Sequence, residues 1–444
     1  MYAVIGAGPM GLATARALQQ AGLPFRVYES HRDVGGLWDI ENPHSTVYES
    51  AHLISSKRMT EFAEYPMRDT VAPYPHHREL RDYFRGFADR FALRPHIAFD
   101  TRVLRVEPDG DGWFVDVEHA GVRRRDRVDG VLIASGTLHH PHRPALPGVF
   151  AGRVLHSAEY KSPSVFAGQR VLVVGCGNSG ADIAVDAVHH AASVDLSVRR
   201  GYWFVPKFVR GRPADAIGGR IKLPRAIKQR VDALLIRLLM GKPSDYGLPD
   251  PDYRLYESHP VVNSLVLHHL GHGDIRARGD VRAVDGHRVT FADGSSAEYD
   301  VILQATGYDL DYPYIDRAWL NWPQDKAAPQ LYLKVFTPRS PSLFVMGMVE
   351  AAGLGWEGRA EQARLVATYL RGVREGSATA LELQRVVSAR AGERLDGGMR
   401  YLKLDRMAYY VHKDSYRRAV TELTAALGRE LRPLVVSPGQ PSSQ

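Results

Sequence analysis

The chain has 444 residues, enough for two or three domains, and its hydrophobic content of 44% is typical of a globular protein. Its net charge of +7 indicates an attraction for anionic nucleotides. The basic clusters, such as residues 123–125, are short, scattered and not interleaved with aromatic residues, which disfavours nucleic acid as a partner. The single cysteine, Cys176, excludes both an internal disulfide and a redox-active cysteine pair.

The first predicted element is a buried strand at residues 2–5, which runs into a glycine turn and then into a helix over 12–20. Gly6 permits a tight turn, Gly8 lets the main chain approach a pyrophosphate, and Gly11 lets the helix pack close to the strand. The N-terminus of such a helix favours phosphate. This pattern predicts a dinucleotide site that includes Pro9 and Met10 of the same turn.

A second strand, predicted at residues 25–28, ends in Glu29, about twenty residues after the glycines, where a carboxylate accepts hydrogen bonds from an adenosine ribose. The next turn carries Gly36, Leu37 and Trp38, and its flat indole is a candidate lining for the far end of the cofactor. Further along, the spacing of apolar residues predicts an amphipathic helix over 78–93.

A β-hairpin is predicted around residues 103–117, and an apolar strand over 128–134 then ends in Ser135 and Gly136. The same unit occurs again later. A second fingerprint at residues 171–180 precedes a helix over 181–189, and after another hairpin the apolar strand 302–304 ends in Ala305, Thr306 and Gly307. The second turn contains Gly175, Gly177, Asn178, Ser179 and Gly180. Two fingerprints in series predict two dinucleotide sites.

The spacing predicts an α/β protein with two Rossmann-like dinucleotide-binding domains, one inserted in the other. The first domain is expected over 1–160 and again over 301–375, with the strand at Ile302 and the segment 342–371 completing its sheet. The second is expected over 161–300, and residues 376–444 are expected to form an appended helical tail. That tail contains an amphipathic helix over 416–427 and a Pro/Ser-rich, disordered end at 437–444.

Two dinucleotides on one chain imply electron transfer between them, with FAD held in the first site and NAD(P)H visiting the second. The strand at 193–198 ends in Arg199 and Arg200 in place of an acidic residue. Because guanidinium groups suit a 2′-phosphate, this favours NADPH. The reduced flavin could then pass electrons to oxygen or to another acceptor, while transfer to a disulfide is excluded by the single cysteine.

The junction between the two units reads FAGRVLHSAEY at residues 150–160, with His156 at its centre and Tyr160 at its end. This matches the FxGxxxHxxx[YF] signature and resembles flavin-containing monooxygenases, that is, class B flavoprotein monooxygenases. The GGLW turn at 35–38, both fingerprints and the ATGY segment at 305–308 also resemble this family in order and spacing, over roughly residues 1–375. In the family the linker motif, and with it His156, connects the NADP site to the flavin.

The resemblance implies that NADPH reduces FAD, that O2 adds to the flavin at C4a, and that a soft nucleophile, amine nitrogen or sulfur, of a small organic substrate attacks the resulting hydroperoxide. Such chemistry needs a dry, preorganised pocket and no metal. The resemblance also places the segment containing His52, Ile54, Ser55 and Lys57 at the flavin face. It places the loop containing Met348 and Val349 at the edge of the flavin ring.

One position departs from the family, because Ile54 stands where the family usually has an asparagine, and isoleucine cannot donate a hydrogen bond. Baeyer–Villiger oxygenation of ketones is therefore an open alternative, although Tyr160 replaces the tryptophan of dedicated Baeyer–Villiger enzymes. An uncoupled NADPH oxidase is a second alternative. A nucleotide-binding flavoprotein with little turnover is a third, from another class.

The strand begins immediately after Met1 without a basic leader, so the sequence predicts no secretory signal and, with one cysteine, a cytoplasmic protein. The apolar run 231–240 is far shorter than the roughly 20 residues that span a bilayer. It is expected to be a helix packed on the core or over the active site, in preference to a helix lying on a membrane. No integral membrane span is expected, and a homodimer is among the assemblies left open.

Overall fold

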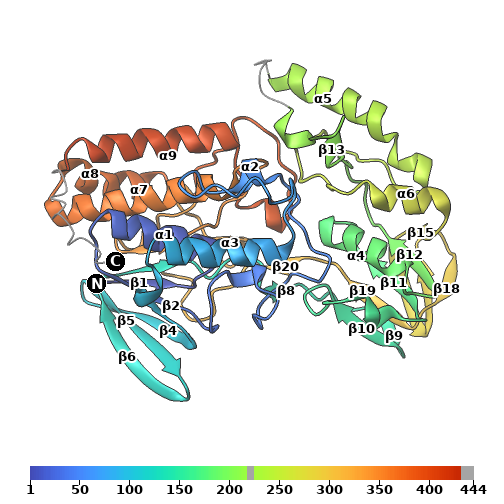
Figure 1. Ribbon diagram of the computed structural model, residues 1–444, viewed down its shortest axis with the longest axis horizontal. Coiled ribbons are helices and arrows are strands. Elements are labelled where there is room, and N and C mark those ends of the chain that lie inside the picture. Colours follow the sequence, from blue (N-terminus) through green and yellow to red (C-terminus); the bar gives the residue numbers. More distant parts are fainter. Residues whose placement is uncertain (218–224, 432–444) are drawn as a thin grey trace.

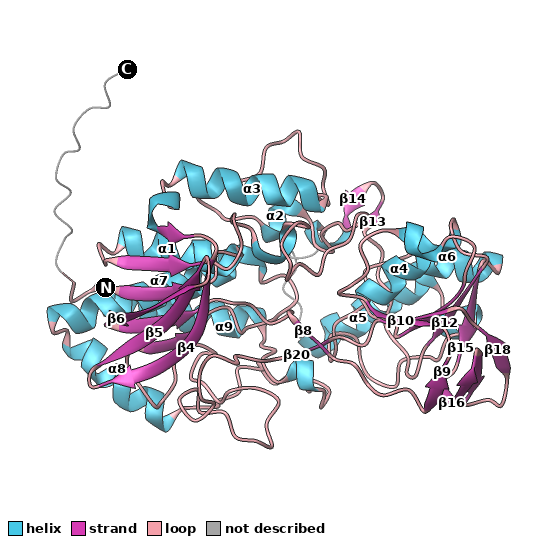
Figure 2. Ribbon diagram, turned by 90° about the horizontal axis from the view of Figure 1, so that it is seen from below, coloured by secondary structure: helices cyan, strands magenta, loops and turns pink. Residues whose placement is uncertain are grey.

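The computed structural model describes residues 1–217 and 225–431, and they form two lobes, each built on a five-stranded parallel sheet (Figures 1 and 2). The first sheet has the order β21-β7-β1-β2-β3 and the second the order β10-β19-β11-β12-β15. The bounds are β1 (Tyr2–Ile5), β2 (Phe25–Tyr28), β3 (Ile97–Ala98), β7 (Gly130–Ile133), β21 (Leu343–Val345), β10 (Arg153–His156), β11 (Arg170–Val174), β12 (Ser193–Ser197), β15 (Ile275–Arg278) and β19 (Val301–Gln304).

The alternation of side chains along β1 shows how the first sheet is covered on both faces. Val4 faces a core that includes residues of α1 and α7, whereas Ala3 and Ile5 belong to a core that includes Trp113 and Val115 of β5. Figure 1 shows the helical layer above this sheet and the small sheet β4-β5-β6 below it. The bounds are α1 (Pro9–Gln20), α3 (His77–Arg90), α7 (Gly355–Glu375), β4 (Thr101–Asp109), β5 (Gly112–His119) and β6 (Val122–Val128).

The second lobe repeats this plan. One face of its sheet carries α4 (Asn178–Val188) and α6 (Leu265–His272), and the other carries the small sheet β18-β17-β16-β9. The strands of that small sheet are β9 (Gly148–Phe150), β16 (Val281–Gly286), β17 (Arg288–Phe291) and β18 (Ser296–Glu298). The predicted repeat of strand, turn, helix, hairpin and apolar strand is therefore confirmed, as is the Rossmann-like fold class.

Further elements are α2 (Lys57–Thr60), β8 (His140–Pro141), β13 (Phe208–Val209), β14 (Arg212–Pro213), α5 (Arg225–Met240) and β20 (Tyr308–Asp309). Strands β8 and β20 pair with each other, as do β13 and β14. Within the described ranges, no helix combines the length and the apolarity that a membrane span requires.

The prediction that the strand at Ile302 completes the first sheet is wrong. This strand is β19, and it pairs with β10 and β11 in the second sheet, with Ile302 opposite Leu172. It is the counterpart of β7, which pairs with β1 in the first sheet. Strand β21 returns to complete the first sheet, as predicted for the segment that follows Ser342. The predicted domain boundaries otherwise stay a prediction.

The C-terminal helices are part of the first core and not an appended tail. The predicted amphipathic helix is confirmed as α9 (Lys413–Gly428), and its Tyr416 and Val420 are buried with α7. Leu383 of α8 (Ala378–Ala389) joins the same core. These helices cover α7, whose own face would otherwise expose apolar surface to water. The end predicted to be disordered, residues 437–444, lies outside the described residues.

Candidate functional site

The first glycine turn has no room for side chains at its two outer glycines. Gly6 has φ +101°, and a Cβ there would lie 2.8 Å from the Ala134 carbonyl oxygen. A Cβ on Gly11 would overlap the Gly6 carbonyl oxygen. The main chain is therefore closed tightly around the N-terminus of α1, where exposed N–H groups favour a phosphate.

Glu29 is held against this turn at the end of β2. Its Oε2 accepts a hydrogen bond from the Ala7 N–H at 2.6 Å, and its Oε1 accepts one from the His31 N–H at 2.8 Å. Burial raises the pKa of Glu29, and the two N–H donors act against that rise. A carboxylate has about four acceptor positions, so capacity for ribose hydroxyl donors is left.

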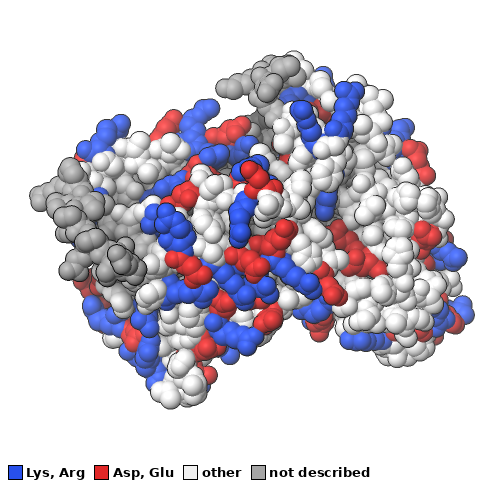
Figure 3. Space-filling model, viewed as in Figure 1, with Lys and Arg blue, Asp and Glu red and all other residues white. Residues whose placement is uncertain are grey.

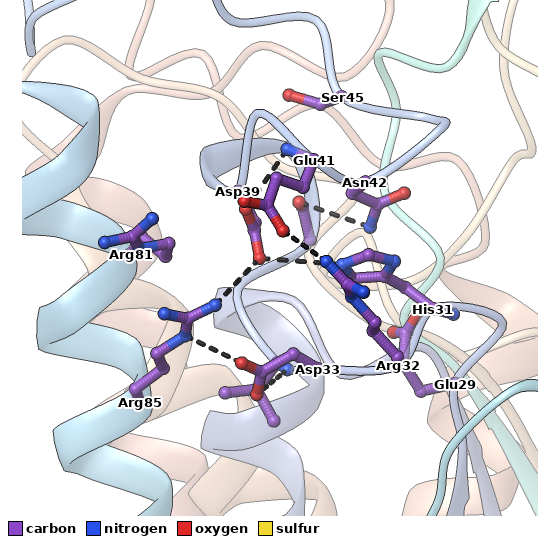
Figure 4. Close-up of polar contacts among 12 residues, drawn as sticks. Glu29, His31, Arg32, Asp33, Asp39, Glu41, Asn42, Ser45, Arg81 and Arg85 are labelled. Atoms are coloured by element: carbon purple, nitrogen blue, oxygen red, sulfur yellow. Dashed lines mark hydrogen bonds and ion pairs between the residues drawn. The ribbon is translucent and has the colours of Figure 1, made fainter.

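Charged residues that the sequence analysis did not identify fix the turn beyond Glu29 (Figure 4). Asp39 is fully buried, and its Oδ2 lies 3.3 Å from Nη2 of Arg85 and 3.5 Å from Nε2 of His31. Nε of Arg85, which comes from α3, lies 2.7 Å from Oδ2 of Asp33. Since a buried carboxylate is costly without partners, this network holds α3 and the turn in one arrangement.

The Gly36-Leu37-Trp38 turn lies beside the first glycine turn and between the two lobes. A Cβ on Gly36 would lie 2.9 Å from the Gly8 Cα, so these two main chains approach closely. Leu37 packs against the core of the second lobe, and Trp38 packs against both cores. The structure thus brings these predicted residues together with Gly8 at the junction of the lobes.

The loop after β21 lies on the first turn of α1. A Cβ on Gly347, which has φ +76°, would lie 2.8 Å from Cγ of Met10. Met348 and Val349 follow directly and are fully buried. At the end of β7, Gly136 has φ +86°, and its Cβ would meet open space. Residues far apart in the sequence therefore converge around the first fingerprint.

The second glycine turn has the same geometry. Gly175 has φ +105°, and its Cβ would lie 2.6 Å from the Ala305 carbonyl oxygen, whereas a Cβ on Gly180 would overlap the Gly175 carbonyl oxygen. A Cβ on Gly177 would meet nothing within 4 Å. Asn178, next to Ser179 at the start of α4, accepts a hydrogen bond from the Val262 N–H at 2.7 Å. The open position at Gly177 fits a pyrophosphate approaching the main chain.

Arg199 and Arg200 follow β12, the strand next to the second turn. Arg199 is exposed, and the Arg200 guanidinium lies 5.6 Å from the ring centre of Tyr202 and 5.7 Å from that of Tyr253. Stacking of this kind holds a guanidinium in place and leaves its edge N–H donors available. In Rossmann folds, residues at this strand end contact the substituent on the ribose.

His156 of the linker is buried, and both of its ring nitrogens make hydrogen bonds to the main chain. Its Nδ1 accepts a hydrogen bond from the Ala158 N–H at 3.1 Å, so the proton is on Nε2, which lies 3.1 Å from the Gly307 carbonyl oxygen. Burial lowers the pKa of this imidazole. Thr306, next to Gly307, donates to the His142 carbonyl oxygen at 2.5 Å. These bonds connect the linker to the turn that follows β19.

Two carboxylates of α4 that the sequence analysis missed attach the second lobe to the first. The Tyr48 hydroxyl donates to Asp182 at 2.9 Å, and the Ser50 hydroxyl donates to Asp186. Asp186 also accepts from the hydroxyl of Tyr160, the last residue of the linker motif, at 2.9 Å. Burial raises the pKa of both carboxyls. The sequence does carry a signal for this pair. Asp182 and Asp186 are spaced i, i+4, so they share one side of the helix that follows the second fingerprint.

The segment predicted to face the flavin has most of its polar side chains bound within the protein. The Lys57 ammonium donates to the carbonyl oxygens of Arg68 and Asp69 at 2.9 and 3.2 Å. Ser55 Oγ lies 2.6 Å from Thr60 Oγ1, and His52 Nδ1 lies 2.7 Å from the Ser50 carbonyl oxygen. Ile54 is partly buried. The structure therefore places Lys57 and Ser55 as residues that hold this segment in shape.

The second lobe also contacts this segment. The Ser56 N–H donates to Oδ2 of Asp215 at 2.7 Å, and the Tyr74 hydroxyl donates to the Lys207 carbonyl oxygen. Both second-lobe partners flank the β13–β14 hairpin. The predicted flavin-face segment is thus in contact with both lobes.

His77 provides a pH-dependent contribution to stability next to this segment. Burial lowers its pKa from 6.5 to about 4, and among the described residues its Nε2 has no hydrogen-bond partner. The unfolded chain therefore binds an extra proton between pH 6.5 and 4, so stability is lost as pH falls through this window. We expect His77→Gln to make the melting temperature less dependent on pH between these values. An unchanged pH slope would contradict this assignment.

Two parallel sheets, each ending in a glycine turn at a helix N-terminus, are the arrangement of a protein with two dinucleotide sites. The family model for flavin-binding monooxygenase-like proteins matches residues 1–422. The chain therefore belongs to this family, uses FAD and NADPH, and is a flavin-dependent monooxygenase. The match reaches well beyond residue 375, so the expectation that the C-terminal helices lie outside the family is wrong.

Individual relatives agree with this assignment. Flavin-containing monooxygenase 5 of Rattus norvegicus is 33% identical over 384 residues, covering 79% of this chain and 69% of the relative. The dimethylaniline monooxygenase [N-oxide-forming] 2 of the same organism is 32% identical, covering 84% and 73%. Among solved structures, cyclohexanone monooxygenase in its open form has a TM-score of 0.71 at 20% identity, covering 97% of this chain and 98% of that one. S-allyl-L-cysteine S-oxygenase from Allium sativum has a TM-score of 0.66 at 21% identity, covering 97% and 91%.

Proposed function

We propose that the protein oxygenates a soft nucleophilic atom, nitrogen or sulfur, of a small organic substrate, through the C4a-hydroperoxyflavin that the family resemblance implies. The observation that carries this proposal is the 32% identity to a monooxygenase named for N-oxide formation, over 84% of this chain. The linker supports it, because Tyr160 stands where dedicated Baeyer–Villiger enzymes have tryptophan.

The residues of this chain supply binding, orientation and protection from water. The turns at Gly6–Gly11 and Gly175–Gly180 would hold the two pyrophosphates, and the open space at Gly177 fits that role. FAD, when bound, accepts a hydride from NADPH and activates O2 for transfer to the substrate. The bonds from Asp182 and Asp186 to the first lobe hold the second site at a fixed distance from the first.

The experiment is to mix the reduced holoenzyme with O2, with and without NADP⁺, and then to offer an amine, a sulfide and a ketone. We expect a transient flavin–oxygen species that lasts longer with NADP⁺, and N- or S-oxide formed in proportion to NADPH consumed. Lactone or ester formed from the ketone alone would reject the proposal in favour of Baeyer–Villiger oxygenation. Baeyer–Villiger oxygenation is the second candidate because Ile54 stands where the family usually has an asparagine.

The same reaction distinguishes an oxidase and a protein with little turnover from an oxygenase. Stoichiometric hydrogen peroxide with every substrate would identify an uncoupled NADPH oxidase. A flavin that NADPH fails to reduce without oxygen would identify a nucleotide-binding flavoprotein with little turnover. Product, peroxide and NADPH are measured together, so the readouts are independent.

Ile54 sets the degree of coupling. We expect Ile54→Asn to lower the peroxide released per NADPH by about fivefold, because a single new hydrogen bond contributes about 1 kcal/mol. Ile54→Leu is the matched control, since it keeps an apolar side chain of the same size without a donor. Equal peroxide yields for Ile54→Asn, Ile54→Leu and the unmodified enzyme would show that this position does not protect the intermediate.

A further inference from the structure

Helix α5 has apolar side chains on two opposite faces, and the second lobe covers only one of them. On the covered face, Ala233 and Ile236 pack against the cluster of Trp203, Tyr253 and Leu255. The other face, called here the outer face, carries six aliphatic side chains in solvent. Their exposed fractions are Ile227 50%, Val231 40%, Leu234 60%, Leu235 51%, Leu238 74% and Leu239 56%.

This exposure differs from the expectation that the run at 231–240 packs on the core. Exposed aliphatic residues are ordinary when they are scattered, but a row at i, i+4, i+7 and i+11 forms a continuous apolar strip. A helix that is apolar all round is normally buried in a core or in lipid. In Figure 1, α5 runs along the outer margin of the second lobe. The strip therefore lacks a partner within the described chain and is reachable by an external one.

The charges on α5 decide between the external partners. Among the helix residues whose side chains the structure describes, Lys228, Arg230 and Arg237 are basic, and the acidic residue Asp232 is already paired with Lys228. Figure 3 shows basic side chains beside uncharged surface in this region. A second copy of the chain, joined face to face, would bring the same positive charges together. Anionic headgroups would instead be attracted to these side chains while the strip enters the acyl boundary.

We propose that the outer face of α5 docks the protein on an anionic lipid bilayer, with the helix lying in the plane of the headgroups. A helix of 16 residues is about 24 Å long, too short to cross the bilayer, and its charged flanks keep it at the interface. This inference concerns a surface outside the two nucleotide sites and does not rest on the proposed substrate.

The test sediments the FAD-loaded protein with vesicles of phosphatidylcholine alone or of phosphatidylcholine with phosphatidylglycerol. We expect binding to the mixed vesicles at low salt, weakened by high salt and by removal of phosphatidylglycerol. The double variant Leu234→Glu/Leu238→Glu is expected to bind at least about tenfold more weakly, because two charges enter the strip. The matched control is Val122→Glu/Leu381→Glu, which places the same charges at residues 69% and 53% exposed elsewhere.

Retained flavin absorbance in every variant shows that the compared proteins are folded holoenzymes. The proposal is overturned if the unmodified protein stays in the supernatant with anionic vesicles, or if both double variants sediment to the same extent. It is also overturned if light scattering finds a dimer that Leu234→Glu/Leu238→Glu converts to a monomer, because the outer face would then be a subunit interface.

Discussion

Replacing Gly180 with alanine is expected to slow flavin reduction by NADPH strongly while FAD stays bound. The new Cβ would overlap the Gly175 carbonyl oxygen, so the second turn must open to accommodate it. Overpacking of this kind costs about 1–3 kcal/mol, and each 1.4 kcal/mol is tenfold, so NADPH affinity should fall by about 5–150-fold. FAD content and NADPH titration of the purified variant measure the two sites separately.

Gly177→Ala is the companion variant to Gly180→Ala, at the open glycine of the same turn. Its φ is an ordinary −78°, and its Cβ would meet nothing within 4 Å, so the protein alone should tolerate the methyl group. A bound pyrophosphate would not, because it needs the main chain at contact distance. We therefore expect unchanged melting and weaker NADPH binding. Full NADPH affinity in Gly177→Ala would place the nucleotide elsewhere.

The double variant Arg199→Ala/Arg200→Ala is expected to raise the KM for NADPH by about 10–100-fold. A hydrogen bond to a charged group contributes about 1.5–3 kcal/mol, and a 2′-phosphate would lose its guanidinium partners. NADH has no such phosphate, so its KM should change little. The pair of values distinguishes recognition of the phosphate from general damage to the site.

The control for this variant removes the same charge far from the site. Arg123 and Arg385, with side chains 76% and 84% exposed, make surface ion pairs of little energetic value. Arg123→Ala/Arg385→Ala should therefore leave both KM values unchanged. An equal effect of the two double variants would mean that net charge alone governs the attraction of NADPH.

The two glycine turns could be predicted from sequence because their requirements are local. A residue at φ +101° beside a carbonyl oxygen must be glycine, and that demand is visible at Gly6 and again at Gly175. The apolar strands were equally clear, since a strand covered on both faces is apolar throughout. Glu29 was found from its distance to the turn, and the structure places it there with two N–H donors.

What could not be predicted depends on contacts distant in sequence. The sheet to which Ile302 belongs is set by which strand it pairs with, and an apolar strand fits either sheet equally well. The bond from Tyr48 to Asp182 spans 134 positions, so no local pattern reveals its partner. The surroundings of helix α5 could not be predicted either. Its apolar composition is the same whether its outer face meets a core, a membrane or water.

We propose that a flavin in the first site receives a hydride from NADPH in the second. Anaerobic mixing of the purified yellow protein with NADPH tests it directly by following the visible absorbance of the flavin. We expect complete bleaching with one NADPH consumed per FAD, and a far slower reaction in Gly180→Ala. A flavin that stays oxidised under NADPH in the unmodified protein would contradict it.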